Sequence, residues 1–535
     1  MKKVYIALVA VALGSSLFFT QCKKPSENFD FSINADVFDN TVAVKLYDAA
    51  TPGIAPKNIT LTIEGKSANG IYEISGRKEF KVVDGIISLG VHPSIAPTEG
   101  SPVEFVINVT APGYLKVRMP VTVLLGQETK MVAISMINIE NPPLGVTVVT
   151  ETVALTGGAT TTPVAIATPA AAPGEPSAAV AIAPGTSFKD NAGNTISGAS
   201  LNATMVHFNT QHAGSLNAFP GSGFNSNDIK DPNGNTVSGM FQTAGFTSIE
   251  MDMGGTAVKQ FSQPVDVAIG IDASQTNPST GAAFAVGDII PIWSYQVETG
   301  KWIYEKQGTV SNNGGKLEVA FNTTHLTYYN LAFLQSTCAQ ATVNFNTGLA
   351  SSETFLVDIF AGNETVIPAI SGYVVQVANN ATASFENVPT GNVTMKVYRN
   401  IAENSQTDWS IRTAPVGTFT GTLCGDVATV QLVVPVSNPI AFNIEGKCKN
   451  NAVNPVVRPS VDIWYRLAGA NTEYSMLGHV SQGLFQTTNL NFMSTYDFKV
   501  IWDGSTVFLK TKQIDSMNYQ RTIEVPAAYE KYFCK

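Results

Sequence analysis

The chain of 535 residues has few charged side chains: Asp, Glu, Lys and Arg make up 14% of it, whereas an average soluble protein has about 25%. Acidic residues outnumber basic ones by 41 to 32, which gives a net charge of −9. Nucleic-acid binding depends on clustered lysine and arginine, so nucleic acid is not an expected partner. Hydrophobic residues make up 44% of the chain, and this composition favours extracellular all-β modules over a cytosolic enzyme or a disordered chain.

Known catalytic motifs are missing as well. None of the five histidines begins a His-Glu-x-x-His motif, and no serine stands in a Gly-x-Ser-x-Gly motif. The best acid–base candidate is Glu250 with Asp252, which would share one face of a strand about 6.5–7 Å apart. Two carboxylates on the wet face of an amphipathic strand are the simpler explanation. We therefore predict no catalytic residues, no metal site, no cofactor and no enzymatic activity.

The apolar segment at the N-terminus is short. It covers residues 4–19 and follows the basic pair Lys2 and Lys3. Sixteen residues are too few to cross a hydrocarbon core of about 30 Å comfortably. The segment therefore predicts a secretory signal peptide over residues 1–21 rather than a permanent membrane span.

Cys22 directly follows this segment and resembles the lipidated cysteine of bacterial lipoproteins. The residues before it, Phe19-Thr20-Gln21, depart from the leucine and small residues that this family prefers there. The resemblance implies that Cys22 carries the lipid, that residues 22–29 form a tether, and that the membrane is a partner. It implies an exported protein anchored at the outer membrane or cell surface of a Gram-negative bacterium.

Only four cysteines follow Cys22, and their spacing is regular: Cys338 to Cys424 and Cys448 to Cys534 are both intervals of 86 residues. An even number of cysteines in an exported chain indicates disulfides. Three pairings are possible, and the equal intervals favour Cys338–Cys424 and Cys448–Cys534. Each bond would close one β-sandwich, the first over residues 336–437 and the second over residues 438–535.

Two turn motifs carry a family resemblance. The segment that opens at Phe385, FENVPTGNVTMKVYRN, resembles a turn and strand of carboxypeptidase regulatory-like, transthyretin-type sandwiches. The turn Ala111-Pro112-Gly113-Tyr114 is similar to the same family and lies in a predicted sandwich over residues 30–142. Asp84-Gly85 between two apolar runs predicts a hairpin there. Such domains are usually adaptors or spacers, so the resemblance implies no chemistry.

A larger all-β domain is predicted over residues 143–335. It opens with an Ala-, Pro- and Thr-rich stretch at residues 160–184, in which alternation favours edge strands over a flexible linker. Two related turns begin at Asp190 and Asp231. Neither has the distal glutamate of a calcium loop, so we interpret both as hairpin turns, with calcium binding as the alternative.

Four aromatic residues of this domain alternate along a predicted hairpin around Thr299-Gly300. Their faces could merge into a platform that stacks sugar rings, although such ladders more often stabilise a core. The four residues are Trp293, Tyr295, Trp302 and Tyr304.

These observations predict an all-β chain of tandem β-sandwich domains, Ig-like or transthyretin-like, that extends away from the membrane. The leading functional hypothesis is a non-enzymatic, lipid-anchored surface protein that acts as a multi-domain binding, adhesion or scaffold module. The alternative is a carbohydrate-binding lipoprotein that captures glycan through the aromatic platform. The ligand, protein or glycan, is not specified by the sequence.

Overall fold

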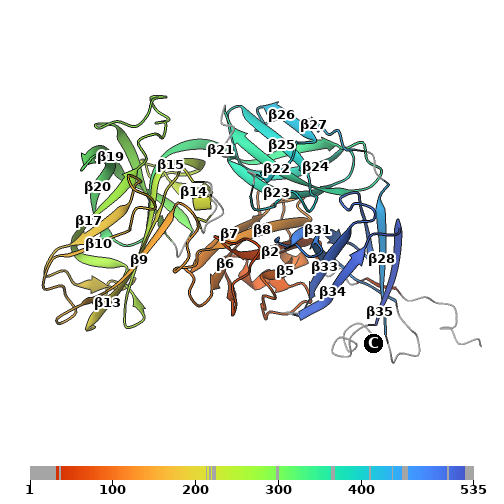
Figure 1. The fold of residues 1–535 in the computed structure, drawn as a ribbon, viewed down its shortest axis with the longest axis horizontal. Helices are drawn as coiled ribbons and strands as arrows, with labels where there is room; N and C mark the ends of the chain where they lie inside the picture. The colour runs from red at the N-terminus through yellow and green to blue at the C-terminus, as the bar shows by residue number, and fades with distance from the viewer. Residues whose placement is uncertain are drawn as a thin grey trace, which may run out of the picture.

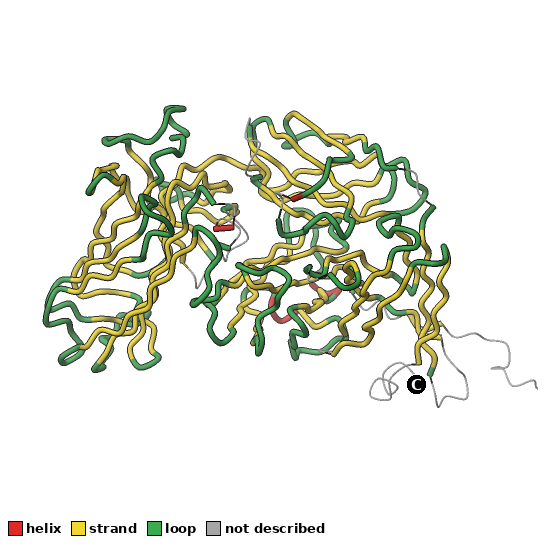
Figure 2. The backbone as a smooth tube through the Cα atoms, viewed as in Figure 1, coloured by secondary structure: helices red, strands yellow, loops and turns green. Residues whose placement is uncertain are grey.

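The computed structural model describes residues 32–34, 38–212, 214–215, 218–219, 224–296, 300–362, 368–408, 411–435, 438–448, 456–470, 472–502 and 505–524. Its elements are almost all strands, with short 3-10 turns such as Ala68–Gly70 and Pro93–Ile95 (Figure 2). The predicted all-β class with tandem sandwich domains is therefore confirmed. Among the described residues, no helix is long and apolar enough to cross a membrane.

The first module pairs two sheets, with strand orders β4-β5-β2-β8 and β3-β6-β7. Strict alternation in β6 buries Val103, Phe105, Ile107 and Val109 in the core between the sheets. Asp84-Gly85 forms the predicted hairpin turn, with φ of +49° and +77°. The strands are β2 (Asn40–Asp48), β3 (Thr60–Glu64), β4 (Ile71–Glu73), β5 (Ile86–Val91), β6 (Val103–Thr110), β7 (Val117–Val123) and β8 (Thr129–Met136).

The middle domain follows Pro142-Pro143. Its strands form one long hydrogen-bonded sheet that curls around two apolar cores, in the order β10-β11-β17-β20-β19-β18-β21-β15-β13-β9. The Ala-, Pro- and Thr-rich stretch supplies β10 and β11 at one end of this path. The strands up to β20 are β9 (Val146–Ala154), β10 (Val164–Ala167), β11 (Ala178–Ile182), β12 (Phe188–Lys189), β13 (Ser200–Phe208), β14 (Asn225–Lys230), β15 (Thr236–Met253), β16 (Thr256–Ala257), β17 (Gln260–Ile271), β18 (Ile289–Gln296), β19 (Lys301–Asn313) and β20 (Lys316–His325).

Strand β21 (Tyr328–Asn346) joins the middle domain to the third module without a break. Its first half pairs with β15 and β18, and its second half pairs with β24 and β27. The predicted boundary between residues 335 and 336 therefore falls inside a continuous strand rather than in a linker. The other strands of the third module are β22 (Glu353–Ala361), β23 (Ile370–Val377), β24 (Ala381–Pro389), β25 (Val393–Arg399), β26 (Gly417–Gly421) and β27 (Ala428–Gln431).

The fourth module contains a strand from the other end of the chain. Strand β1 (Ser32–Asn34) runs parallel to β29, so the predicted first module of residues 30–142 is wrong at its N-terminal end. A parallel pairing between segments more than 400 residues apart leaves no local pattern. The remaining strands are β28 (Ile440–Lys447), β29 (Val456–Arg458), β30 (Val461–Leu467), β31 (Ser475–Val480), β32 (Leu484–Thr487), β33 (Thr495–Trp502), β34 (Ser505–Gln513) and β35 (Asn518–Glu524).

The first, third and fourth modules pack against one another, and the middle domain lies at one end of the long axis (Figure 1). Strand β2 shows the cause: Val42, Val44 and Leu46 face the core of the first module, whereas Ala43 and Lys45 face the fourth. A strand buried on both faces cannot belong to an isolated sandwich. The expectation that the domains extend one after another away from the membrane is therefore wrong for these three modules, which pack side by side.

Candidate functional site

The four aromatic residues predicted as a platform lie in a core. Trp293 and Trp302 are each 2% exposed, Tyr295 is 3% exposed and Tyr304 is half-buried. The two strands of the predicted hairpin pair with each other, and their register places Trp293 opposite Tyr304 and Tyr295 opposite Trp302. The merged face points inward, however, and Phe241 packs against Trp302 with ring centroids 4.8 Å apart. The aromatic-platform hypothesis is therefore wrong, because a ring enclosed by other rings cannot stack on a sugar.

This aromatic core also explains the contact between the first module and the middle domain. Leu115 and Ile137 of the first module are buried in the same cluster. Trp293 donates its indole N–H to the backbone oxygen of Ala332 at 2.9 Å, which satisfies its one polar group. The residues form a structural core that spans two units.

The turns at Asp190 and Asp231 use their carboxylates internally. Asp190 Oδ1 accepts hydrogen bonds from the backbone N–H groups of Ala192 and Asn194 at 2.9 and 2.8 Å. The side chain of Asn194 donates to the other oxygen at 3.1 Å, and these donors lower the pKa of Asp190. The Asp231 turn repeats these contacts with Asn233 and Asn235. Both segments are hairpin turns, and no cluster of metal-ligating side chains occurs in the described part of the chain.

Glu250 and Asp252 lie on one face of β15, as predicted, with the buried Met251 and Met253 on the other. Glu250 is exposed to solvent and Asp252 is half-buried. Asp252 Oδ1 accepts from the side chain of Asn202 at 3.3 Å and from the N–H of Gly255 at 3.1 Å. The carboxylate of Asp252 therefore supports the pairing of β15 with β13 and the turn that follows β15.

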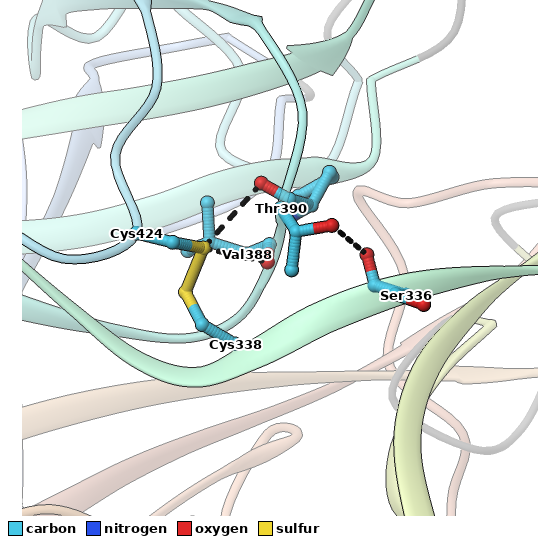
Figure 3. The surroundings of a disulfide bond; sticks show 6 residues. Ser336, Cys338, Val388, Thr390 and Cys424 are labelled. Atoms are coloured by element: carbon cyan, nitrogen blue, oxygen red, sulfur yellow. Dashed lines mark hydrogen bonds between the residues drawn. A yellow bond between two sulfur atoms is a disulfide. The ribbon is translucent and has the colours of Figure 1, made fainter.

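Cys338 and Cys424 are joined by a disulfide, with Cα atoms 5.9 Å apart. Cys338 lies on β21 and Cys424 follows β26, so the bond holds the shared strand to the rest of the third module. Figure 3 shows the bond beside Val388 and Thr390, in the region where Thr390 donates its hydroxyl to the backbone oxygen of Ser336 at 3.2 Å. Cys448 is also disulfide-bonded. Cys22 and Cys534 lie outside the described residues, so lipidation and the second pairing stay predictions.

An ion pair that the sequence analysis missed connects three modules. Lys45 of the first module contacts Glu473 of the fourth, and both side chains are less than one tenth exposed. Ser405 and Thr407 of the third module donate hydroxyls to Glu473 at 2.7 and 3.0 Å. Burial opposes ionisation of Glu473, but the charge of Lys45 and these hydrogen bonds hold its pKa below the usual value.

Glu353 of the third module makes a second buried polar contact, in this case with the fourth. It is 1% exposed and accepts hydrogen bonds from the hydroxyl of Thr487 at 2.9 Å, the hydroxyl of Thr488 at 2.7 Å and the amide of Asn489 at 2.8 Å. A carboxylate that is removed from water needs such donors, because an unpaired buried charge is costly. This contact fixes the orientation of the two modules relative to each other.

Asp462 of the fourth module links it to the first. Its carboxylate accepts from the hydroxyl of Ser88 at 2.5 Å and lies 2.8 Å from Nδ1 of His479. Asp462, like Lys45 and Glu353, belongs to a strand whose other residues are largely apolar. A charged residue within an apolar strand was the signal that could have revealed the interfaces between modules.

A surface cavity of about 630 Å³ opens between the third and fourth modules. Its floor is the outward face of the sheet formed by β32, β28 and β35, and Ser351, Ser352 and Gln376 of the third module form one side. Asp, Glu, Lys and Arg are absent from the residues that line it. Phe442, Leu484, Phe485 and Tyr519 also line it, so the cavity is a groove of mixed polar and apolar surface, without Asp, Glu, Lys or Arg, at a contact between two modules.

No family model and no curated protein matches the chain. Solved structures similar to it include the Bacillus anthracis TIE protein, the streptococcal ancillary pilin and the major pilin subunit of Bacillus cereus.

The identities to these three proteins are 10%, 12% and 8%, and the TM-scores are 0.13, 0.12 and 0.13. The matches cover 71%, 48% and 91% of this chain and 57%, 96% and 98% of the other chains, respectively. The chain thus spans 57% of the length of the TIE protein. At these scores the likenesses carry no functional argument.

Proposed function

We propose that this chain is an exported, lipid-anchored, non-enzymatic protein that acts as a multi-domain binding or scaffold module on a bacterial cell surface. Cys22 would carry the lipid and residues 22–29 would form the tether. Two or three acyl chains hold a folded body on a membrane stably, whereas one chain would be marginal. A Gram-negative outer membrane is the membrane that we propose.

The observation that carries this proposal is the position of β1. Ser32 lies ten residues after Cys22, and β1 pairs with β29 of the fourth module. The fourth module and the middle domain lie at opposite ends of the long axis (Figure 1). A lipid on Cys22 would therefore hold the fourth module near the membrane and present the middle domain away from it.

The packing of the other modules supports a scaffold role. Buried polar contacts join the first, third and fourth modules into one packed unit. This unit would hold the middle domain at a defined distance from the membrane. We assign the first and third modules to the carboxypeptidase regulatory-like type on their turn motifs, and in that type spacer or adaptor roles are usual. The surface turns of the middle domain, including those at Asp190 and Asp231, are then available to a macromolecular partner.

Metabolic labelling with a fatty acid tests the anchor. The unmodified chain should incorporate label and fractionate with membranes, and Cys22→Ser should lose both properties while it keeps its fold. The matched control is Ser26→Ala, a change in the tether that leaves the lipid acceptor intact. Continued labelling of the Cys22→Ser protein would overturn the proposed anchor.

The orientation has its own test. Brief protease treatment of intact cells should cut the middle domain before the fourth module if the former projects outward. Protection of the whole chain until the cells are opened would contradict display on the cell surface.

A further inference from the structure

The groove between the third and fourth modules has a regular floor. Strand β28 runs between β32 and β35, and the register places Ala441 between Gln486 and Asn518. In the next outward-facing row, Asn443 lies between Leu484 and Gln520. The alternate residues of β28, Phe442 among them, pack toward the core of the module. The small side chain of Ala441 thus leaves a hollow that is bordered by amide side chains.

These amides have no partner in the part of the chain that the structure describes: the side chains of Asn443, Gln486, Asn518 and Gln520 make no hydrogen bond there. Each amide offers two N–H donors and a carbonyl acceptor. The hydroxyls of Ser351 and Ser352, which face the floor from the third module, are equally unused.

A hydrogen bond between the two modules holds the wall of the groove at the point where they meet. Gln376 accepts a hydrogen bond from the backbone N–H of His479 at 2.9 Å, so the third module is tied to β31 beside the groove. The imidazole of His479 lies 2.8 Å from Asp462, and the side chain of Asp462 is 0% exposed. The groove is therefore present before any ligand arrives, which lowers the entropic cost of binding.

The lining offers little to a charged ligand. Asp, Glu, Lys and Arg are absent from it, and its one histidine, His479, is already paired with the buried carboxylate of Asp462. A ligand that uses the free groups must itself present many neutral donors and acceptors close together. Sugar hydroxyls meet this requirement, because vicinal hydroxyls can both donate to and accept from one amide. The volume of about 630 Å³ lies within the usual range for small-ligand sites.

We propose that this groove binds a short stretch of neutral oligosaccharide, with the amides of β28, β32 and β35 as its hydrogen-bonding surface. The inference names a ligand class for the binding role proposed above. It moves carbohydrate recognition from the buried aromatic residues of the middle domain to the contact between the third and fourth modules. Ser351 and Ser352 complete the site from the opposite side.

The test uses the full-length chain purified in detergent and calorimetric titration. The probes are cello-, malto-, laminari- and xylohexaose, with a chondroitin sulfate hexasaccharide as the charged comparison. At least one neutral hexaose should bind, and the sulfated one should not. Ala441→Trp, which fills the hollow, should abolish binding, and the double variant Asn443→Ala/Gln486→Ala should weaken it by about tenfold or more.

The matched control is Gln307→Ala, which removes an exposed amide from β19 of the middle domain and should leave affinity unchanged. Gln520→Ala, a milder change, keeps the test decisive if Ala441→Trp fails to fold. The proposal is overturned if no neutral hexaose binds, if the sulfated probe binds instead, or if the groove variants bind as the unmodified chain does. Lipid labelling of Cys22 is unaffected by any of these outcomes, so failure of the ligand class and failure of the anchor are distinguishable.

Discussion

Lys45 of the first module and Glu473 of the fourth form an ion pair in the contact between their modules, and hydroxyls of the third module complete it. The two residues are 428 positions apart in sequence. Removing both charges from water is costly, and the gain comes only when the three modules meet in one arrangement. The pair therefore specifies how the modules are assembled more than it adds to their net stability.

Lys45→Met should destabilise the assembled chain by about 3–5 kcal/mol, because Glu473 would remain buried without its cation. Urea unfolding of the variant and of the unmodified chain measures the difference in free energy. Lys81→Met is the matched control: Lys81 and Glu79 form an exposed pair, and its loss should cost less than about 1 kcal/mol. Lys45→Met/Glu473→Leu should recover much of the loss, and a double variant as unstable as the single one would contradict this account.

The burial of His207 should make the stability of the fold depend on pH. His207 is 1% exposed on β13, and burial lowers its pKa from 6.5 to about 4, against a hydrogen bond with the backbone of Gly270. The folded state therefore favours neutral imidazole, and the unfolded chain takes up a proton first as the pH falls. The contribution of neutral His207 to the free energy of unfolding is fully present above pH 6.5. It decreases between pH 6.5 and about 4, by up to about 3 kcal/mol.

Unfolding free energies measured between pH 7 and pH 4 test this sign. His207→Gln should flatten the curve in that window, whereas His92→Gln, at an exposed histidine, should leave the slope as it is. An unchanged slope in the His207 variant would rule out this residue as the cause.

Trp302→Ala should destabilise the middle domain by about 3–5 kcal/mol, because it empties a large volume in the aromatic core. Thermal unfolding followed by near-ultraviolet circular dichroism reports the loss. At a temperature where the variant is folded, its affinity for the neutral hexaoses should equal that of the unmodified chain. Selective loss of sugar binding without loss of stability would restore the aromatic-platform hypothesis.

The disulfide between Cys338 and Cys424 closes a loop of 86 residues. In the chain-entropy model, such a loop is worth about 4–5 kcal/mol of stability. Cys338→Ala/Cys424→Ala should therefore lower the free energy of unfolding of the third module by up to that amount in guanidinium titrations. Non-reducing peptide mapping of the unmodified chain should recover Cys338 with Cys424 and Cys448 with Cys534, and crossed pairs would contradict the division into two clasped modules.

Much of the local structure was predictable because its causes are local. The alternation of Val103, Phe105 and Ile107 has the period of a strand, and it places these residues in a core. Asp84-Gly85 takes positive φ in a hairpin turn, as this dipeptide commonly does. The candidate site was not predictable in the same way, because its amides lie on three strands and its opposite side on another module.

Local sequence patterns are sufficient to show that this protein is built from β-sandwiches, where many of its strands and turns fall, and which residues alternate. Tertiary structure decided the inward direction of the Trp293–Trp302 face, the partner of β1, and the compact packing of three modules around Lys45 and Glu473. The physical reason is the range of the interactions. Side-chain alternation and turn geometry act over a few residues, whereas the choice of a buried face depends on surfaces brought together from hundreds of residues away.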